Sequence, residues 1–367
     1  MGDEPGANLA IVSSPLQALN ADEWRAAVGG PCDLVVIGDR HAGGLDDVMK
    51  RGGPWRTIFR HGRRPRPPRM LPRLAKDVLD AWHRAGLERL ATRLAGWRYA
   101  RVAFGDYRNV SQRLLVDRVS RSAATLLDDG SVTPQAAAFR ADPASVLEPG
   151  QFDLALFRTA FARRLFGDPL IPGPGRMTFF TIYGRLIEGG LAASDSAEAN
   201  RYEVLRASVR AAPRGGAAWL IGANHGEAGI CAPEDYRALV LAAADRLRAE
   251  GRGPIVYRRH RGQSPKTAAE LSEAAGMTLA PSTAPVELDY LDAVERPATV
   301  AVFASTAADT LATLDPDLDI ARVALPATYL RKRVHHIQAV VAGHDAFNPR
   351  LRVIDLDMTP PRECGSR

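Results

Sequence analysis

The sequence has 367 residues, of which 46% are hydrophobic and 25% charged, close to the globular average, so a wholly disordered or fibrous chain is excluded. This length exceeds what one hydrophobic core usually serves and favours two domains. The net charge of +6 comes almost entirely from arginine, and no stretch approaches the ~18 consecutive apolar residues of a transmembrane helix.

The first half alternates short β-branched runs with stretches of helical spacing, a pattern typical of α/β folds. The predicted strands cover residues 8–13, 33–37, 101–104, 123–127 and 179–183. The predicted helices cover residues 16–28, 73–97, 110–119 and 153–165. From residue 188 to 216 the composition turns to Ala, Gly, Ser and Asp, with a short helix expected at 202–209, and we place the domain boundary in this stretch.

The second half restarts the same alternation. Its predicted strands cover residues 217–222, 254–257, 299–304 and 320–325, and its predicted helices cover 234–250, 266–275, 307–314 and 329–342. Two successive α/β halves predict two Rossmann-like domains, residues 1–210 and 211–367, facing a central cleft. In such sheets ligands bind beyond the carboxyl ends of the strands.

Other features bear on location and partners. The three cysteines, Cys32, Cys231 and Cys364, are far apart and predict neither a disulfide framework nor a metal site. Together with an acidic N-terminus unlike a signal peptide, they favour the reducing cytoplasm. The basic run Arg60–Arg69 is interpreted either as a solvated loop or as a peripheral contact with an anionic membrane at its inner face. Its prolines exclude a DNA-reading helix, and no nucleic-acid partner is expected.

Two adjacent carboxylates, Asp128 and Asp129, follow the predicted strand 123–127 and precede Gly130. Successive side chains of an extended chain point to opposite faces, so only one carboxylate can face a cleft while the other supports the loop. An ordinary Asp-Gly turn is the alternative.

Three features of the second half could bind a phosphate or a nucleoside. His260, flanked by Arg258, Arg259 and Arg261, follows the strand 254–257 and could hydrogen-bond a phosphate or protonate a leaving group. Ser305 and Thr306 precede a helix, where hydroxyls and free backbone N–H groups bind phosphate or simply cap the helix. Glu287 could accept two ribose hydroxyls at the rim of the sheet, although a surface glutamate is the simpler interpretation.

Taken together, these motifs resemble the bacterial sialyltransferases of the GT-B fold, particularly the polysialyltransferase-like family. The resemblance rests on the order Ser13-Ser14-Pro15-Leu16-Gln17, Asp128-Asp129-Gly130, His260, Glu287 and Ser305-Thr306, with family-like text at residues 219–222, 227–230 and 234–236. Two departures are that Arg261 stands where the family has proline, and that the last motif is Ser-Thr rather than Ser-Ser.

The resemblance implies an inverting transfer of sialic acid or a related nonulosonic acid from a CMP-sugar to a glycan acceptor, with no metal or other cofactor. Asp129 would be the general base and Asp128 its support. His260 would serve the departing CMP phosphate, together with Ser305 and Thr306. Further contacts to the donor would come from the remaining candidates, Glu287 at the ribose, Ser14 and Gln17 near the sugar, and Gly130, Arg261 and Gly222.

Two alternatives remain open from the residues themselves. A GT-B transferase for another nucleotide sugar could clamp a diphosphate with Arg258, Arg259 and Arg261, and a non-catalytic protein could bind anions through Arg60–Arg69. No Gly-rich phosphate loop and no metal-binding sequence motif such as HExxH is present, so we expect the charge of a monophosphate leaving group to be met by His260 and hydroxyls.

Overall fold

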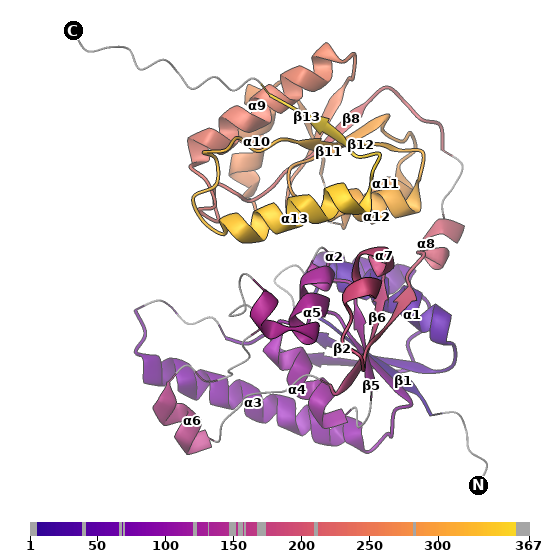
Figure 1. Cartoon of the computed structure of the whole chain (residues 1–367), viewed down its shortest axis with the longest axis vertical. Helices are drawn as coiled ribbons and strands as arrows, with labels where there is room; N and C mark the ends of the chain where they lie inside the picture. Colours follow the sequence, from indigo (N-terminus) through magenta and orange to yellow (C-terminus); the bar gives the residue numbers. More distant parts are fainter. Residues whose placement is uncertain are drawn as a thin grey trace. The chain divides into compact units, whose positions relative to one another are not determined.

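A computed structural model gives the fold of the chain (Figure 1). It describes residues 6–38, 42–65, 68, 70–119, 123–130, 132–146, 152, 157, 159–166, 174–208, 212–281 and 284–356. The chain divides into two compact units, Met1–Ser208 and Val209–Arg367. Each unit is a parallel β-sheet covered by helices, which confirms the predicted α/β class.

The first unit contains a seven-stranded sheet in the order β3-β2-β1-β4-β5-β6-β7, with every pair parallel. Its strands are β1 (Asn8–Val12), β2 (Cys32–Ile37), β3 (Ile58–His61), β4 (Arg101–Phe104), β5 (Ala123–Leu127), β6 (Arg176–Thr181) and β7 (Ser196–Ala199). Its α-helices are α1 (Pro15–Val28), α2 (Ala42–Arg51), α3 (Arg73–Ala95), α4 (Val110–Val119), α5 (Val132–Ala141), α6 (Ala160–Phe166), α7 (Gly184–Ile187) and α8 (Glu203–Ala207).

The second unit contains a six-stranded parallel sheet in the order β10-β9-β8-β11-β12-β13. Its strands are β8 (Ala218–Ile221), β9 (Ile255–Arg258), β10 (Thr278–Leu279), β11 (Thr299–Val302), β12 (Asp319–Val323) and β13 (Arg352–Ile354). Its helices are α9 (Pro233–Ala249), α10 (Pro265–Ala274), α11 (Val286–Asp292), α12 (Ala307–Leu314) and α13 (Val334–Phe347).

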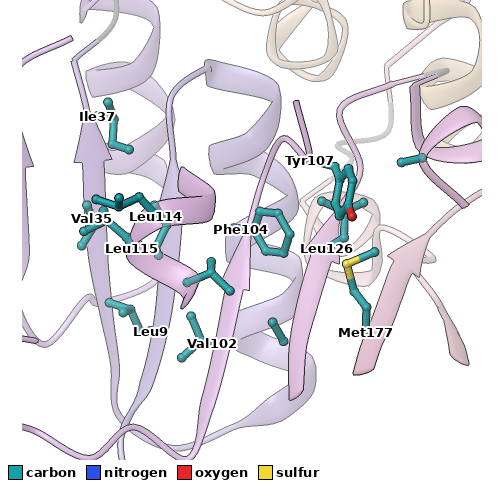
Figure 2. Packing of buried hydrophobic residues seen from close by; sticks show 14 of the residues in the cluster. Leu9, Val35, Ile37, Val102, Phe104, Tyr107, Leu114, Leu115, Leu126 and Met177 are labelled. Carbon is teal, nitrogen blue, oxygen red and sulfur yellow. The ribbon is translucent and has the colours of Figure 1, made fainter. Parts of the chain in front are cut away.

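The sequences of the central strands in the first unit are continuously apolar because these strands lie in the middle of its hydrophobic core. Strand residues such as Leu9, Val35 and Phe104 belong to one buried cluster with Leu114 and Leu115 of α4 (Figure 2). Strands of a parallel sheet are buried on both faces by helices, so alternation between polar and apolar residues disappears. The sequence pattern therefore marks these strands correctly.

Some predicted elements needed correction. The strand predicted at 179–183 is β6, which begins at Arg176, and the helix predicted at 329–342 begins only at Val334, after Arg333 adopts a left-handed conformation with φ 54°. The helix predicted at 153–165 overlaps α6, while residues 153–156 and 158 lie outside the described residues. The prediction missed β7, which lies inside the stretch interpreted as a boundary. Its Ser-Ala-Glu-Ala sequence has no β-branched residue, and the strand forms through backbone pairing with β6 at the sheet edge.

Both sheets reverse their strand order at one point, which positions the candidate residues. In the first unit the strands run outward from β1 through β2 to β3, and the next strand, β4, lies on the other side of β1. In the second unit the strands run outward from β8 through β9 to β10, and β11 lies on the other side of β8. Such switch points leave a crevice at the carboxyl ends of the two strands. Ser13 follows β1, and Ser305 lies in the loop between β11 and α12.

Candidate functional site

The two adjacent carboxylates after β5 have different environments. Asp128 is 2% exposed, and its Oδ2 accepts a 2.8 Å hydrogen bond from the Ile182 backbone N–H. Its carbonyl oxygen accepts another from Asn20 Nδ2 at 2.8 Å. The Asp129 side chain is 20% exposed, and Gly130, with φ 71°, turns the chain toward α5. Asp128 therefore braces the loop, and Asp129 is the carboxylate that reaches solvent.

Two side chains from other elements donate hydrogen bonds to Asp129 and orient its carboxylate. Gln17 Nε2 donates to Oδ1 at 3.0 Å, and Arg108 Nη2 donates to Oδ2 at 3.1 Å. Although burial lowers the pKa of the Arg108 guanidinium, the carboxylates of Asp106 and Asp129 outweigh it and raise this pKa above its ordinary value. Each carboxylate oxygen has two lone pairs, so these contacts orient the group while leaving it able to accept a proton.

Gln17 is the centre of the hydrogen-bond network beneath Asp129. Its buried amide oxygen accepts from the Ser13 backbone N–H at 2.8 Å and from Gln112 Nε2 at 2.9 Å. A methyl group on Gly105 would overlap the Gln17 side chain, so only glycine allows this approach. These contacts make Gln17 a positioning residue for Asp129, and the sugar contact that the resemblance implies for it stays a prediction.

Ser14 also has a structural partner. It is the N-cap of α1, and its Oγ accepts from the Gln17 N–H at 3.3 Å, with Pro15 following as the first helical residue. Ser14 is 7% exposed. It therefore starts the helix that presents Gln17, and the sugar contact expected for Ser14 from the sequence stays a prediction.

In the second unit, the loop after β9 defines the state of the His260 ring. The Gly262 backbone N–H donates to His260 Nδ1 at 3.0 Å, and the Gln263 N–H donates to the His260 carbonyl at 2.9 Å. Because Nδ1 accepts a hydrogen bond, the neutral ring carries its proton on Nε2. The geometry therefore presents Nε2–H as a donor, the role expected toward a phosphate oxygen.

The arginines around His260 are not equivalent. Arg258 is ion-paired with Asp289, its guanidinium lies 3.5 Å from the centre of the Trp219 ring, and burial lowers its pKa. Arg259 Nη1 donates to the Gln263 carbonyl at 2.6 Å. Arg261 is exposed. The predicted three-arginine clamp therefore has one member already engaged with a carboxylate and an indole inside the unit.

Ser305 and Thr306 lie where the chain enters α12. Ser305 Oγ accepts from the Ala307 N–H at 3.3 Å, whereas Thr306 occupies the N-cap position without a side-chain capping hydrogen bond. The partial positive charge of the helix N-terminus favours an anion at this position.

Glu287 lies beside the same helix rather than on the surface. It belongs to the first turn of α11, is 5% exposed, and accepts a 2.7 Å hydrogen bond from Thr310 Oγ1 of α12. Burial raises its pKa, and the nearby charge of Arg261 opposes this shift. Glu287, Arg261 and the start of α12 thus belong to one region of the second unit.

Gly222 leaves room for the side chain of Tyr257. It follows β8, and a methyl group there would overlap the Tyr257 hydroxyl. That hydroxyl lies 3.0 Å from Tyr236 Oη and donates to Gln263 Oε1 at 3.0 Å. Gly222 therefore accommodates the tyrosine network under the His260 loop, and its expected contact with the donor stays a prediction.

A pocket of about 400 Å³ opens next to this loop, between the N-terminal parts of α9 and α10. Asn224, Glu227, Tyr236, Gln263 and Thr267 are among its lining residues. Its size falls within the range of small-ligand pockets.

The basic run Arg60–Arg69 offers less positive charge than its sequence suggests. Arg60 pairs with Asp46 at 2.8 Å, and Arg64 makes two bonds of 2.8 and 2.7 Å to Asp80. Arg66 and Arg69 lie outside the described residues. In the part of the chain that the structure describes, no three His, Cys, Asp or Glu side chains cluster as metal ligands, and no helix has the length and apolar character needed to cross a bilayer.

Sequence reasoning missed several residues that organise the site, chiefly Asn20, Arg108, Gln112 and Thr310. A signal existed for Arg108, because the polar segment 105–109 directly follows the correctly predicted strand 101–104 and so lies at the carboxyl edge of the sheet. No comparable signal pointed to Thr310, which lies inside an apolar helix.

No model of a known protein family matches the chain, and no curated protein matches it in sequence. Solved structures do share its architecture. S. aureus MnaA, solved with UDP, superposes with a TM-score of 0.52 at 10% identity over 94% of this chain and 89% of that one. The UDP-GlcNAc 2-epimerase from Neisseria meningitidis, bound to UDP-GlcNAc, gives 0.51 at 9% identity over 95% of each chain. A 2,6-sialyltransferase from Photobacterium sp. JT-ISH-224, solved with CMP and lactose, gives 0.48 at 12% identity over 95% and 78%. At these identities the likeness concerns the fold alone, and the chain has an α/β fold of the GT-B type with two Rossmann-like units.

Proposed function

We propose that the protein is an inverting, metal-independent glycosyltransferase that moves sialic acid, or a related nonulosonic acid, from a CMP-sugar to a glycan acceptor. The observation that carries this proposal is that each unit holds one candidate reactive side chain in a defined orientation by hydrogen bonds. Asp129 is oriented by Gln17 and Arg108, and His260 has its Nδ1 occupied by the Gly262 N–H.

In the proposed reaction, Asp129 accepts the proton of the acceptor hydroxyl as the hydroxyl oxygen attacks the anomeric carbon of the donor sugar. The bond from that carbon to the CMP phosphate breaks on the opposite face, so the configuration inverts. A base contributes most when it is held within reach of the proton it removes. The two donors on Asp129 and the buried support from Asp128 serve this purpose.

The leaving phosphate would be bound by the second unit. His260 Nε2–H donates to a phosphate oxygen as negative charge develops, and Ser305, Thr306 and the N-terminus of α12 add neutral donors. Glu287, already oriented by Thr310, would accept from the ribose hydroxyls. A single phosphate suits this modest set of donors.

The second candidate is an enzyme for a UDP-sugar. It is favoured by the structures with TM-scores above 0.5, MnaA solved with UDP and the epimerase solved with UDP-GlcNAc. Against it, a diphosphate needs more cationic side chains or a metal, and Arg258 is already engaged with Asp289 and Trp219.

Two measurements separate the candidates. In thermal unfolding with CMP, UDP or GDP, we expect CMP to stabilise the protein most, since a ligand at 100 times its Kd adds about 2.7 kcal/mol. With CMP-sialic acid and a panel of glycan acceptors, CMP release should depend on the acceptor. Stabilisation by UDP but not CMP, together with turnover of UDP-GlcNAc, would replace the proposal with the second candidate.

A further inference from the structure

The N-terminal half of helix α3 in the first unit has its polarity reversed, whereas its C-terminal half buries Leu87, Ala91 and Leu94 in the core. The fully buried positions of the N-terminal half include Asp77, Asp80 and His83, which are at most 2% exposed. Its solvent-facing positions include Leu74, Val78 and Trp82, which are 52%, 55% and 70% exposed. A helix on a globular protein ordinarily buries its apolar stripe and exposes its charges.

The buried polar groups of α3 are satisfied, which fixes the helix in this orientation. Asp77 accepts from Thr159 Oγ1 at 2.5 Å, Asp80 accepts two bonds from Arg64, and His83 Nε2 lies 2.9 Å from Ser111 Oγ. Rotating α3 to bury Trp82 would leave these polar groups unpaired, and an unpaired buried polar group costs more than a hydrogen bond gains. The apolar stripe therefore stays outside.

Helix α6 extends the exposed apolar surface. It packs beside α3 through Ala162 and the preceding Phe157, which contact Ala81 (Figure 1). Phe161 and Leu165 of α6 are 60% and 61% exposed. We define the α3–α6 face as Leu74, Val78, Trp82, Phe161 and Leu165, which are five of the eleven exposed large hydrophobic residues of the described chain. Such clustering marks an interaction surface.

The charged side chains that these two helices expose at the apolar face are positive. Exposed arginines flank the α3–α6 face at positions 73, 89, 163 and 164. The carboxylates of α3 are engaged, since Asp77 and Asp80 are buried and Glu88 pairs with Arg118 at 3.1 Å. Helix α6 has no carboxylate. The surface is thus apolar in the middle and cationic at the edge.

We propose that the α3–α6 face docks on an anionic lipid surface. Exposed tryptophan and aliphatic side chains enter the boundary between headgroups and acyl chains, while flanking arginines attract anionic headgroups. This assigns the membrane contact to α3 and α6 rather than to the run Arg60–Arg69, in which Arg60 and Arg64 already hold carboxylates. The cationic rim is the reason for choosing a lipid surface over a second copy of this chain, whose matching face would carry the same charge.

The test uses the full chain with vesicles of phosphatidylcholine alone and with vesicles that also contain phosphatidylglycerol, whose headgroups give the surface a negative potential. We expect co-sedimentation with the anionic vesicles only, weakened by high salt. Val78→Glu should lower the affinity at least about tenfold, because it removes apolar contact and places a carboxylate against anionic lipid. Val294→Glu is the matched control, since Val294 is 90% exposed in the second unit, and it should bind like the wild type.

Tryptophan fluorescence reports the orientation of docking. Brominated phosphatidylglycerol should quench the wild type, and Trp82→Phe should lose more of this quenching than Trp97→Phe. Trp82 is 70% exposed on the α3–α6 face, whereas Trp97, 48% exposed, follows the C-terminal end of α3, and Trp24 and Trp219 are buried. The proposal is overturned if the wild type ignores anionic vesicles, if Val78→Glu binds undiminished, or if Trp82→Phe keeps its quenching. It is also overturned if the chain forms a dimer that Val78→Glu dissociates while no vesicle binding occurs.

Discussion

Exchanging each of the two adjacent carboxylates for its amide separates base chemistry from loop support. Asp129→Asn removes the proposed proton acceptor from a side chain that is 20% exposed and that accepts hydrogen bonds from Gln17 and Arg108. Asp128→Asn changes a side chain in a residue that is 2% exposed and that accepts from the Ile182 N–H. The two variants are isosteric with the wild type, so steric effects are matched.

The structure predicts that Asp129→Asn loses transfer activity but keeps its stability, whereas Asp128→Asn loses stability. Losing a partly exposed ion pair costs about 0–1 kcal/mol, so Asp129→Asn should unfold close to the wild type, while loss of a general base lowers transfer ~10²–10⁴-fold. In Asp128→Asn the amide oxygen can still accept from Ile182, but a buried NH₂ group is introduced, which costs about 1–3 kcal/mol if it finds no acceptor. At ~2–4 °C per kcal/mol for a unit of this size, the melting temperature of Asp128→Asn should fall visibly.

The assays are CMP release from CMP-sialic acid with an acceptor, CMP affinity by calorimetry, and thermal unfolding. Both variants should bind CMP like the wild type, because the proposed phosphate and ribose contacts belong to the other unit. If Asp128→Asn is the less active enzyme at a temperature where both are folded, the roles within the pair are reversed. If neither variant loses transfer, Asp128-Asp129-Gly130 is an ordinary turn and the proposed mechanism is wrong.

Four further outcomes are expected. His260→Ala should lower kcat by roughly a hundredfold or more while changing donor affinity little, because its donor acts on charge that develops in the transition state; unchanged kcat in a folded variant would contradict this. Transfer should persist in EDTA, and activity that is lost on chelation and restored by Mg²⁺ would show that the proposal omits a metal. Gly222→Ala should destabilise the second unit by about 1–3 kcal/mol through overlap with Tyr257, whereas Gly343→Ala, which meets no atom within 4 Å, should be neutral or stabilising by up to about 1 kcal/mol. Burial lowers the pKa of His225 to about 4, so the folded state resists its protonation, and stability should be lost as the pH falls from about 6.5 to 4, by on the order of 3 kcal/mol. A melting profile over this pH range that is as steep in His225→Phe as in the wild type would disprove that assignment.

The local pattern of the sequence predicted most of the strands and helices that surround the candidate site. Strands at 101–104 and 123–127 and helices at 110–119 and 307–314 are confirmed at their stated bounds. Buried strands of a parallel sheet carry a continuous apolar signal, and helices carry a periodic one. The same local reasoning predicted that only one of Asp128 and Asp129 could face outward, because successive side chains of an extended chain alternate.

Only the tertiary structure decided which side chains meet. Gln17 and Asp129 are 112 residues apart, and their contact depends on β1, β4 and β5 being neighbours in the sheet, which no local pattern encodes. The position of Glu287 against Thr310 depends in the same way on the packing of α11 beside α12. The N-terminal half of helix α3 is the clearest case, since the sequence predicted a helix over residues 73–97 but did not show that Leu74, Val78 and Trp82 would be exposed. Arg64, Thr159 and Ser111 approach from other elements and bind Asp80, Asp77 and His83, and burial of these satisfied polar groups turns the apolar stripe of the helix toward solvent.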